Sequence, residues 1–122
     1  MAYYKWSCDI AADLTYDPPV DWPANRPIYQ RYHNSHVRLD GLPGIDCFGV
    51  ISPVDHEYLW PGESGVVMMH LSIPMDAGPW MESALQAGRG FAIYIVYELA
   101  ATGVITEMLE PLAPIIPRQR RN

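Results

Sequence analysis

Lysine is almost absent from this sequence, and Lys5 is the only one. A GTP-binding loop needs a glycine-rich segment ending in Gly-Lys-Ser or Gly-Lys-Thr, because the lysine contacts the phosphates and the hydroxyl binds magnesium. The chain contains no such segment. The sequence therefore excludes a GTPase of this type, and we expect no GTP and no other cofactor.

Basic charge is scarce as well. The 122 residues include 8 basic and 14 acidic side chains, and the formal net charge is -6. Arg118, Arg120 and Arg121 lie at the C-terminus, so the rest of the chain is more acidic still. Because affinity for a phosphate backbone comes from lysine and arginine contacts, a broad nucleic-acid surface is disfavoured. A local basic strip remains compatible with this composition.

Cysteine is rare, and Cys8 and Cys47 lie far apart with no closely spaced metal-ligand pattern around them. Two buried thiols are the expected arrangement, because free cysteine is often buried. The spacing is compatible both with a reducing compartment and with one disulfide. The N-terminal segment has no apolar stretch long enough for a secretory signal, so a cytoplasmic location is the default expectation.

Long hydrophobic runs are missing too. The most apolar stretch, "GRGFAIYIVYELAATGVITEML" at residues 88–109, is interrupted by Glu98 after a short run at residues 91–97. A membrane helix needs about 20 predominantly apolar residues, so this stretch does not fit a membrane span. Its β-branched and aromatic residues alternate with period two, as does the partner run at residues 102–108. The pattern predicts a β-hairpin.

The rest of the chain also alternates in short runs separated by proline- and glycine-rich turns. This pattern favours a small antiparallel barrel or sandwich in one domain, residues 1–117, followed by a disordered basic tail, residues 118–122. Strands are predicted at Cys8–Tyr16, Tyr29–Leu39, Cys47–Ile51 and Val66–Ile73. Ile10, Ala12 and Leu14 are predicted to share one face of the first strand, and the second is predicted to be an edge strand. A helical turn is predicted at Trp80–Gln86.

Four segments, in order, resemble the third domain of elongation factor Tu. They are "ADLTYDP", "RPIYQRYHNSHVRLDG", "YLWPGESGVVMMHLSIP" and "GRGFAIYIVYELAATGVITEMLE". The resemblance spans roughly Asp9 to Glu110. It implies a six-stranded antiparallel β-barrel without an active site of its own. In that family the domain docks on a GTPase domain, contacts the T stem of aminoacyl-tRNA and helps bind the nucleotide-exchange factor.

The chain departs from the family where the family contacts tRNA. A Gly-Arg-His-Thr-Pro-Phe motif corresponds here to "PANRPIY", so Ala24 and Asn25 replace the arginine and the histidine. The Glu-Gly-Gly-Arg turn of the last hairpin becomes "IVYE" at residues 95–98. Because Val96 does not readily adopt the positive φ of a glycine turn, we expect the hairpin to turn differently or to extend further before turning, nearer Leu99–Thr102.

One strip combines basic and aromatic side chains, a composition suited to a protein interface or to stacking and phosphate contact. Three interpretations stay open: a solvated edge strand whose charges prevent aggregation, a protein interface, and an RNA contact, which the acidic composition disfavours. The candidate partner-binding residues are Arg26, Tyr29, Arg31, Tyr32, His33, His36 and Arg38.

No residue is predicted to be catalytic. His33 and His36 form a His-X-X-His pair, but an offset of three on a strand places them on opposite faces, so no metal site is expected. Ser52 and Cys47 lack a nucleophile motif. His70, inside an apolar run, is predicted to be a core or cross-strand histidine.

We therefore predict a non-enzymatic, free-standing protein-binding module. One concrete form is an immunity or regulatory protein that imitates or competes with elongation factor Tu at a shared partner. The alternative is a small RNA- or tRNA-binding accessory domain of translation that uses Arg26–Arg38.

Overall fold

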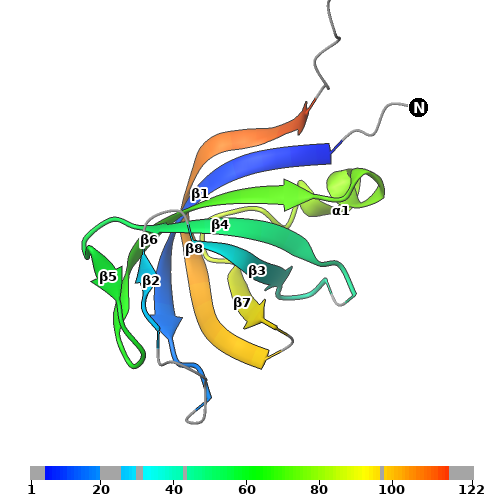
Figure 1. Ribbon diagram of the computed structural model, residues 1–122. Helices are drawn as coiled ribbons and strands as arrows, with labels where there is room; N and C mark the ends of the chain where they lie inside the picture. The colour runs from blue at the N-terminus through cyan, green and yellow to red at the C-terminus, as the bar shows by residue number, and fades with distance from the viewer. Residues whose placement is uncertain (1–4, 20–25, 30–31, 43, 97, 116–122) are drawn as a thin grey trace, which may run out of the picture.

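A computed structural model describes residues 5–19, 26–29, 32–42, 44–96 and 98–115. Six antiparallel strands close into a barrel in the order β1-β6-β4-β3-β7-β8, which confirms the predicted fold class (Figure 1). The barrel strands are β1 (Lys5–Tyr16), β3 (Tyr32–Leu39), β4 (Cys47–Pro53), β6 (Ser64–Ile73), β7 (Gly90–Ile95) and β8 (Glu98–Ile115). A separate two-stranded sheet pairs β2 (Ile28–Tyr29) with β5 (Tyr58–Leu59).

Strand alternation fills the barrel interior. In β1 the residues from Cys8 to Tyr16 alternate between buried and more exposed positions, as the sequence predicted for Ile10, Ala12 and Leu14. The predicted strands at Cys47–Ile51 and Val66–Ile73 are likewise present within β4 and β6. Side chains from every barrel strand meet in one apolar cluster. Period-two patterning is therefore enough to separate the interior from the outer face.

The prediction of an edge strand over Tyr29–Leu39 is wrong in two respects. The segment is divided between β2 and β3, and β3 pairs with β4 on one side and β7 on the other. A closed barrel has no edges, so the polar residues of β3 do not protect an unpaired strand. Closure is a property of all six strands together, and the composition of β3 alone does not reveal it.

The helical turn lies earlier than predicted. A 3-10 turn, η1 (Met75–Ala77), leads directly into a single α-helical turn, α1 (Gly78–Met81), instead of a helix at Trp80–Gln86. A proline in the first turn of α1 has its φ already fixed for a helix, which explains the earlier start. Within the described residues, neither helix has the length and apolar character that crossing a membrane requires.

The last hairpin turns between Ile95 and Glu98, so the alternative in which the strands extend to Leu99–Thr102 is wrong. Ile95 pairs directly with Glu98, so only two residues connect β7 to β8. Val96 adopts the left-handed region with φ of 50° and its side chain is exposed. Pairing along β7 and β8 therefore imposes a backbone conformation that a β-branched residue disfavours.

Val96→Asn is expected to raise the free energy of unfolding by about 1 kcal/mol, because asparagine adopts positive φ more readily than valine. Urea denaturation followed by circular dichroism measures the change. Val104→Asn, at another exposed valine in β8, is the matched control and should not stabilise the protein. Equal effects of the two substitutions would show that the turn stores no strain.

β8 extends further than the predicted hairpin partner. It pairs with β1 along its length, from Tyr16 opposite Ala101 to Lys5 opposite Ile115. Register shifts along this pairing break the strict alternation predicted for residues 102–108. Ile105 is buried, whereas Met108 is only partly buried against the core. The basic tail, residues 118–122, lies outside the described residues.

Both cysteines are free and buried, as predicted. Burial, with a smaller contribution from Asp9, raises the pKa of the Cys8 thiol to about 11. Burial likewise raises the pKa of Cys47 to about 12. A raised pKa in the folded state means that these thiols stay protonated at pH values at which the thiols of the unfolded chain are already deprotonated. Their contribution to stability is present below about pH 9 and is lost as the pH rises toward 11–12.

We expect both thiols to react with an aromatic disulfide reagent at pH 8 at least about 100-fold more slowly in the native protein than in denaturant, because the reactive species is an accessible thiolate. Absorbance of the released thiolate gives the two rates. Rapid stoichiometric labelling of the native protein would contradict the burial. A variant with one exposed serine changed to cysteine, Ser83→Cys, supplies the fast-reacting control.

Candidate functional site

Four outward-facing side chains lie in register across four adjacent strands. Leu99 of β8 pairs with Tyr94 of β7, Tyr94 pairs with His36 of β3, and His36 pairs with Phe48 of β4. The strand neighbours of Tyr94, His36 and Phe48 are buried on both sides, so the pleat turns these three outward. Leu99 is exposed next to buried Ala100, where the pairing of β7 with β8 has a register shift. We call Leu99, Tyr94, His36 and Phe48 the outer-face row. Phe48 is 54% exposed and Leu99 is 47% exposed, which makes both available to a partner.

Ring and charge contacts hold the middle of the outer-face row in place. The rings of His36 and Phe48 lie 4.9 Å apart between centroids and are tilted by 52°. The guanidinium of Arg38 lies over the Tyr94 ring at 4.8 Å. Arg38, His36, Tyr94 and Asp46 line a shallow cavity of about 150 Å³. The surface is therefore aromatic with one fixed cation, not a flat charged strip.

Arg38 is already paired. Its Nε donates to Asp46 Oδ1 at 2.5 Å. The hydrogen bond from Arg38 lowers the pKa of Asp46, and the same contact raises the pKa of Arg38. Asp46 therefore favours the folded state above its ordinary pKa and loses that effect as the pH falls. Both side chains are largely exposed, so water and salt screen the pair and its contribution is small.

A second depression, of about 260 Å³, lies on the outer face of β1, β4 and β6. His70 Nδ1 lies 2.6 Å from Asp9 Oδ1, so His70 is a cross-strand histidine on the outside and the core interpretation is wrong. Ser52 lines the same depression.

The described residues of the predicted binding strip belong to two different sheets or precede them. His36 and Arg38 face outward from β3, whereas Tyr29 lies in the separate β2–β5 sheet, and Arg26 precedes that sheet. Arg31 lies outside the described residues, as do the side chains of Tyr32 and His33, whose backbones belong to β3. Sequence reasoning missed Phe48, Tyr94 and Leu99. Alternation within their strands marks them as outward-facing, but only the strand order places them beside His36.

Three further aromatic residues form a row on the β2–β5 side, and we call them the aromatic ladder: Tyr29, Tyr58 and Trp60. Tyr29 pairs directly with Tyr58, and their ring centroids lie 6.2 Å apart. Tyr58 and Trp60 are also 6.2 Å apart. The three side chains are 53%, 44% and 49% exposed, in chain order. β2 and β5 lie at the opposite end of the barrel from α1 (Figure 1).

The described residues contain no group of three or more histidine, cysteine or acidic side chains arranged to hold a metal ion. The strand order defines a small closed antiparallel β-barrel domain. This domain carries two exposed aromatic surfaces, the outer-face row and the aromatic ladder. No protein-family model matches this chain, and a search of curated proteins finds no relative. The resemblance to elongation factor Tu consequently stays a prediction.

Proposed function

We propose that this chain is a non-enzymatic protein-binding domain and that the outer-face row is its contact surface. The observation that carries the proposal is the alignment of Leu99, Tyr94, His36 and Phe48 across four paired strands. Tyrosine, phenylalanine and arginine are enriched at the centres of protein interfaces, where large rigid rings bury much area at a small entropic cost.

Rigidity supports this proposal. Each residue of the outer-face row lies on a barrel strand paired on both sides, so the surface needs little ordering when a partner binds. Preorganisation reduces the entropic cost of association. Arg38 contacts both Tyr94 and Asp46. The outer-face row is therefore an aromatic surface bordered by the polar Arg38–Asp46 pair. Since Arg38 is neutralised by Asp46, this surface offers little to a phosphate backbone.

The resemblance to the third domain of elongation factor Tu indicates which partners to test. A barrel that imitates this domain without a GTPase domain would compete for a protein that elongation factor Tu also binds. Such competition suits an immunity or regulatory protein. The competing proposal, an RNA- or tRNA-binding accessory domain, is a defined outcome of the experiment below.

The test is a capture experiment with a matched pair of variants. The tagged chain and its variants Phe48→Asp and Val54→Asp are incubated with lysate, and the retained proteins are identified by mass spectrometry. Both substitutions introduce the same charge at an exposed apolar residue, but Val54 lies outside the outer-face row. We expect one protein to be retained by the unmodified chain and by Val54→Asp, lost with Phe48→Asp, and displaced by purified elongation factor Tu.

Retention that Phe48→Asp leaves unchanged would overturn the proposed surface. Retention that elongation factor Tu does not displace would overturn the competitor form of the proposal. Material released by ribonuclease and by raised salt would favour the RNA-binding alternative, because nucleic-acid affinity falls steeply with salt concentration. Far-UV circular dichroism of each variant verifies that the barrel is folded.

A further inference from the structure

We propose that the aromatic ladder is a second binding surface, and that it takes an extended peptide segment bearing arginine side chains. This surface is built from β2, β5 and the residues after β5, whereas the outer-face row is built from β3, β4, β7 and β8. The two surfaces therefore share no residue. The proposal is independent of the function proposed above.

The two tyrosines of the aromatic ladder are flanked by residues that are buried in the core. Ile28 and Leu59 are fully buried members of the apolar core, and each is a strand neighbour of a ladder tyrosine. This alternation turns Tyr29 and Tyr58 outward in a strand pair too short to bury both faces. Contacts from the barrel add support, since the Tyr16 hydroxyl donates to the carbonyl of Arg26 at 2.9 Å. The backbone that carries the two exposed tyrosine rings is therefore held in place by buried neighbours.

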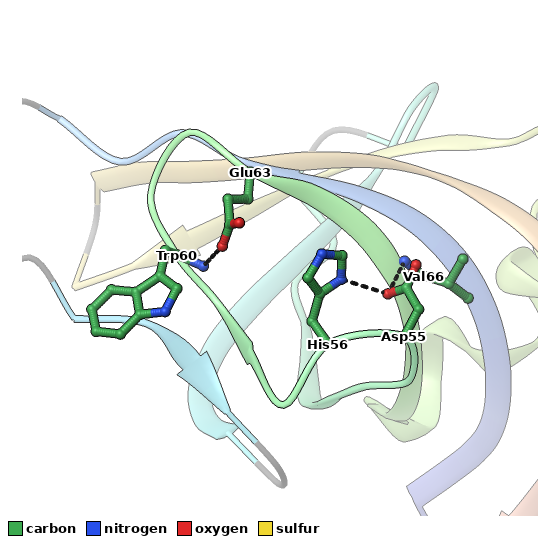
Figure 2. A network of polar contacts seen from close by, with 5 residues as sticks. All are labelled: Asp55, His56, Trp60, Glu63 and Val66. Carbon is green, nitrogen blue, oxygen red and sulfur yellow. Dashed lines mark hydrogen bonds and ion pairs between the residues drawn. The ribbon is translucent and has the colours of Figure 1, made fainter.

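The third ring is fixed by the turn that follows β5. The backbone nitrogen of Trp60 donates to Glu63 Oε1 at 2.7 Å, and Glu63 N donates to the carbonyl of Trp60. Figure 2 shows the result: the Trp60 backbone faces Glu63, while the indole extends away from the barrel strands. A ring so held and still half exposed has a face available to a ligand.

The ring geometry favours separate cationic groups over one flat ligand that would span all three rings. Tyr29 and Tyr58 are tilted by 58° and Tyr58 and Trp60 by 43°, so the three rings do not form one plane on which a sugar or a base would stack. A guanidinium is attracted to the face of a tyrosine or tryptophan within about 6 Å of the ring centroid. Successive tilted rings offer successive sites for such groups along an extended chain.

The charge around the aromatic ladder is of the complementary sign. Residues 53–65 contain Asp55, Glu57 and Glu63 and neither lysine nor arginine. Asp55 is already engaged, because it accepts from Val66 N at 3.0 Å and lies 2.8 Å from His56 Nδ1 (Figure 2). Glu57 is exposed next to Tyr58, and Glu63 lies beside Trp60. These carboxylates attract a cationic partner and repel a nucleic-acid backbone.

Arginine suits this surface better than lysine does. Its planar guanidinium stacks on aromatic rings and forms forked hydrogen bonds with carboxylates at the same time. Arg26, exposed at the start of the same region, is the basic residue of the described chain nearest in sequence to Tyr29. The Tyr29 end of the aromatic ladder therefore has a basic residue nearby in sequence, whereas the Tyr58 and Trp60 end lies in the acidic segment at residues 53–65.

The experiment measures fluorescence anisotropy of a labelled synthetic peptide of alternating arginine and proline, titrated with the full chain. The control peptide has glutamine in place of arginine. Proline keeps both peptides extended, so they differ only in charge and stacking. We expect saturable binding of the arginine peptide, at least about tenfold weaker binding of the glutamine peptide, and weakening with added salt.

The chain offers a matched pair of tryptophan variants. Trp60→Ala removes a ring of the aromatic ladder, and Trp80→Ala removes a ring that is 69% exposed on α1, at the other end of the barrel. Trp60→Ala should weaken arginine-peptide binding by about tenfold or more, and Trp80→Ala should leave it unchanged. Glu57→Gln should weaken it about threefold without a change in the thermal unfolding midpoint.

Equal binding of the two peptides, or equal loss in the two tryptophan variants, would overturn the proposal. Binding of an oligosaccharide or of single-stranded RNA that Trp60→Ala abolishes, without binding of the arginine peptide, would replace it with that ligand class. Phe48→Asp separates this proposal from the first, because it leaves the aromatic ladder intact and should not change peptide affinity.

Discussion

Gly103→Ala is expected to lower the free energy of unfolding by about 3 kcal/mol and the midpoint of thermal unfolding by about 10–15 °C. Gly103 lies in β8 between Leu14 of β1 and Phe91 of β7. A methyl group there would overlap the ring of Phe91, approaching Cε1 to 2.9 Å, and would lie 2.8 Å from the carbonyl oxygen of Asp13. One obstacle is a buried ring and the other is backbone, so neither moves cheaply.

The matched control is Gly44→Ala. Gly44 has φ of 83° and no atom within 4 Å of an added Cβ, so this substitution tests backbone strain without overlap. It should cost only about 1 kcal/mol. Differential scanning calorimetry compares both variants with the unmodified chain. Equal losses would mean that the packing of Phe91 over Gly103 does not limit closure of the barrel.

A double-mutant cycle sharpens this test. Phe91→Leu shortens the side chain that meets the new methyl group, so Gly103→Ala should cost less in that background than alone. Additive costs would show that the ring is not the obstacle. In that case the carbonyl of Asp13 would be responsible, and widening the contact between β1 and β8 would be the main effect.

Leu71→Ala is expected to cost about 3–4 kcal/mol, the range for an interior leucine whose cavity does not collapse. Leu71 is fully buried in β6, and its neighbours in register are Cys8 of β1 and Gly49 of β4. Neither neighbour has a side chain that can fill the space. Leu109→Ala, at a partly exposed leucine of β8, should cost less than about 1 kcal/mol.

Urea denaturation followed by tryptophan fluorescence measures both leucine variants. A loss below about 1 kcal/mol for Leu71→Ala would contradict a close-packed interior. A change in the denaturant slope, without a change in midpoint, would instead indicate altered compactness of the unfolded or native state.

Much of the fold was predictable because strand patterning is local. The alternation at Cys8–Tyr16 marks the buried face of β1, and the run at Val66–Ile73 marks that of β6. Turn position was less predictable. The chain makes its last turn at Val96 because Ile95 and Glu98 pair, so cross-strand pairing overrides the local preference of valine.

The candidate site was predictable only in part, because surfaces join residues that are distant in sequence. His36 and Arg38 were identified from their composition, but their neighbours Tyr94 and Asp46 come from other segments. Tyr29 was grouped with His36 by sequence proximity, and the structure instead places it beside Tyr58.

The sequence by itself determined an all-β chain of short alternating strands, an acidic composition and the absence of a GTP-binding loop, since each depends on residue type or local period. Only the tertiary structure decided that β3 is paired on both sides in a closed barrel and that Tyr29 belongs to a different sheet from His36 and Arg38. The physical reason is that closure fixes which strands are neighbours. Cross-strand register, not distance along the chain, then decides which outward side chains meet.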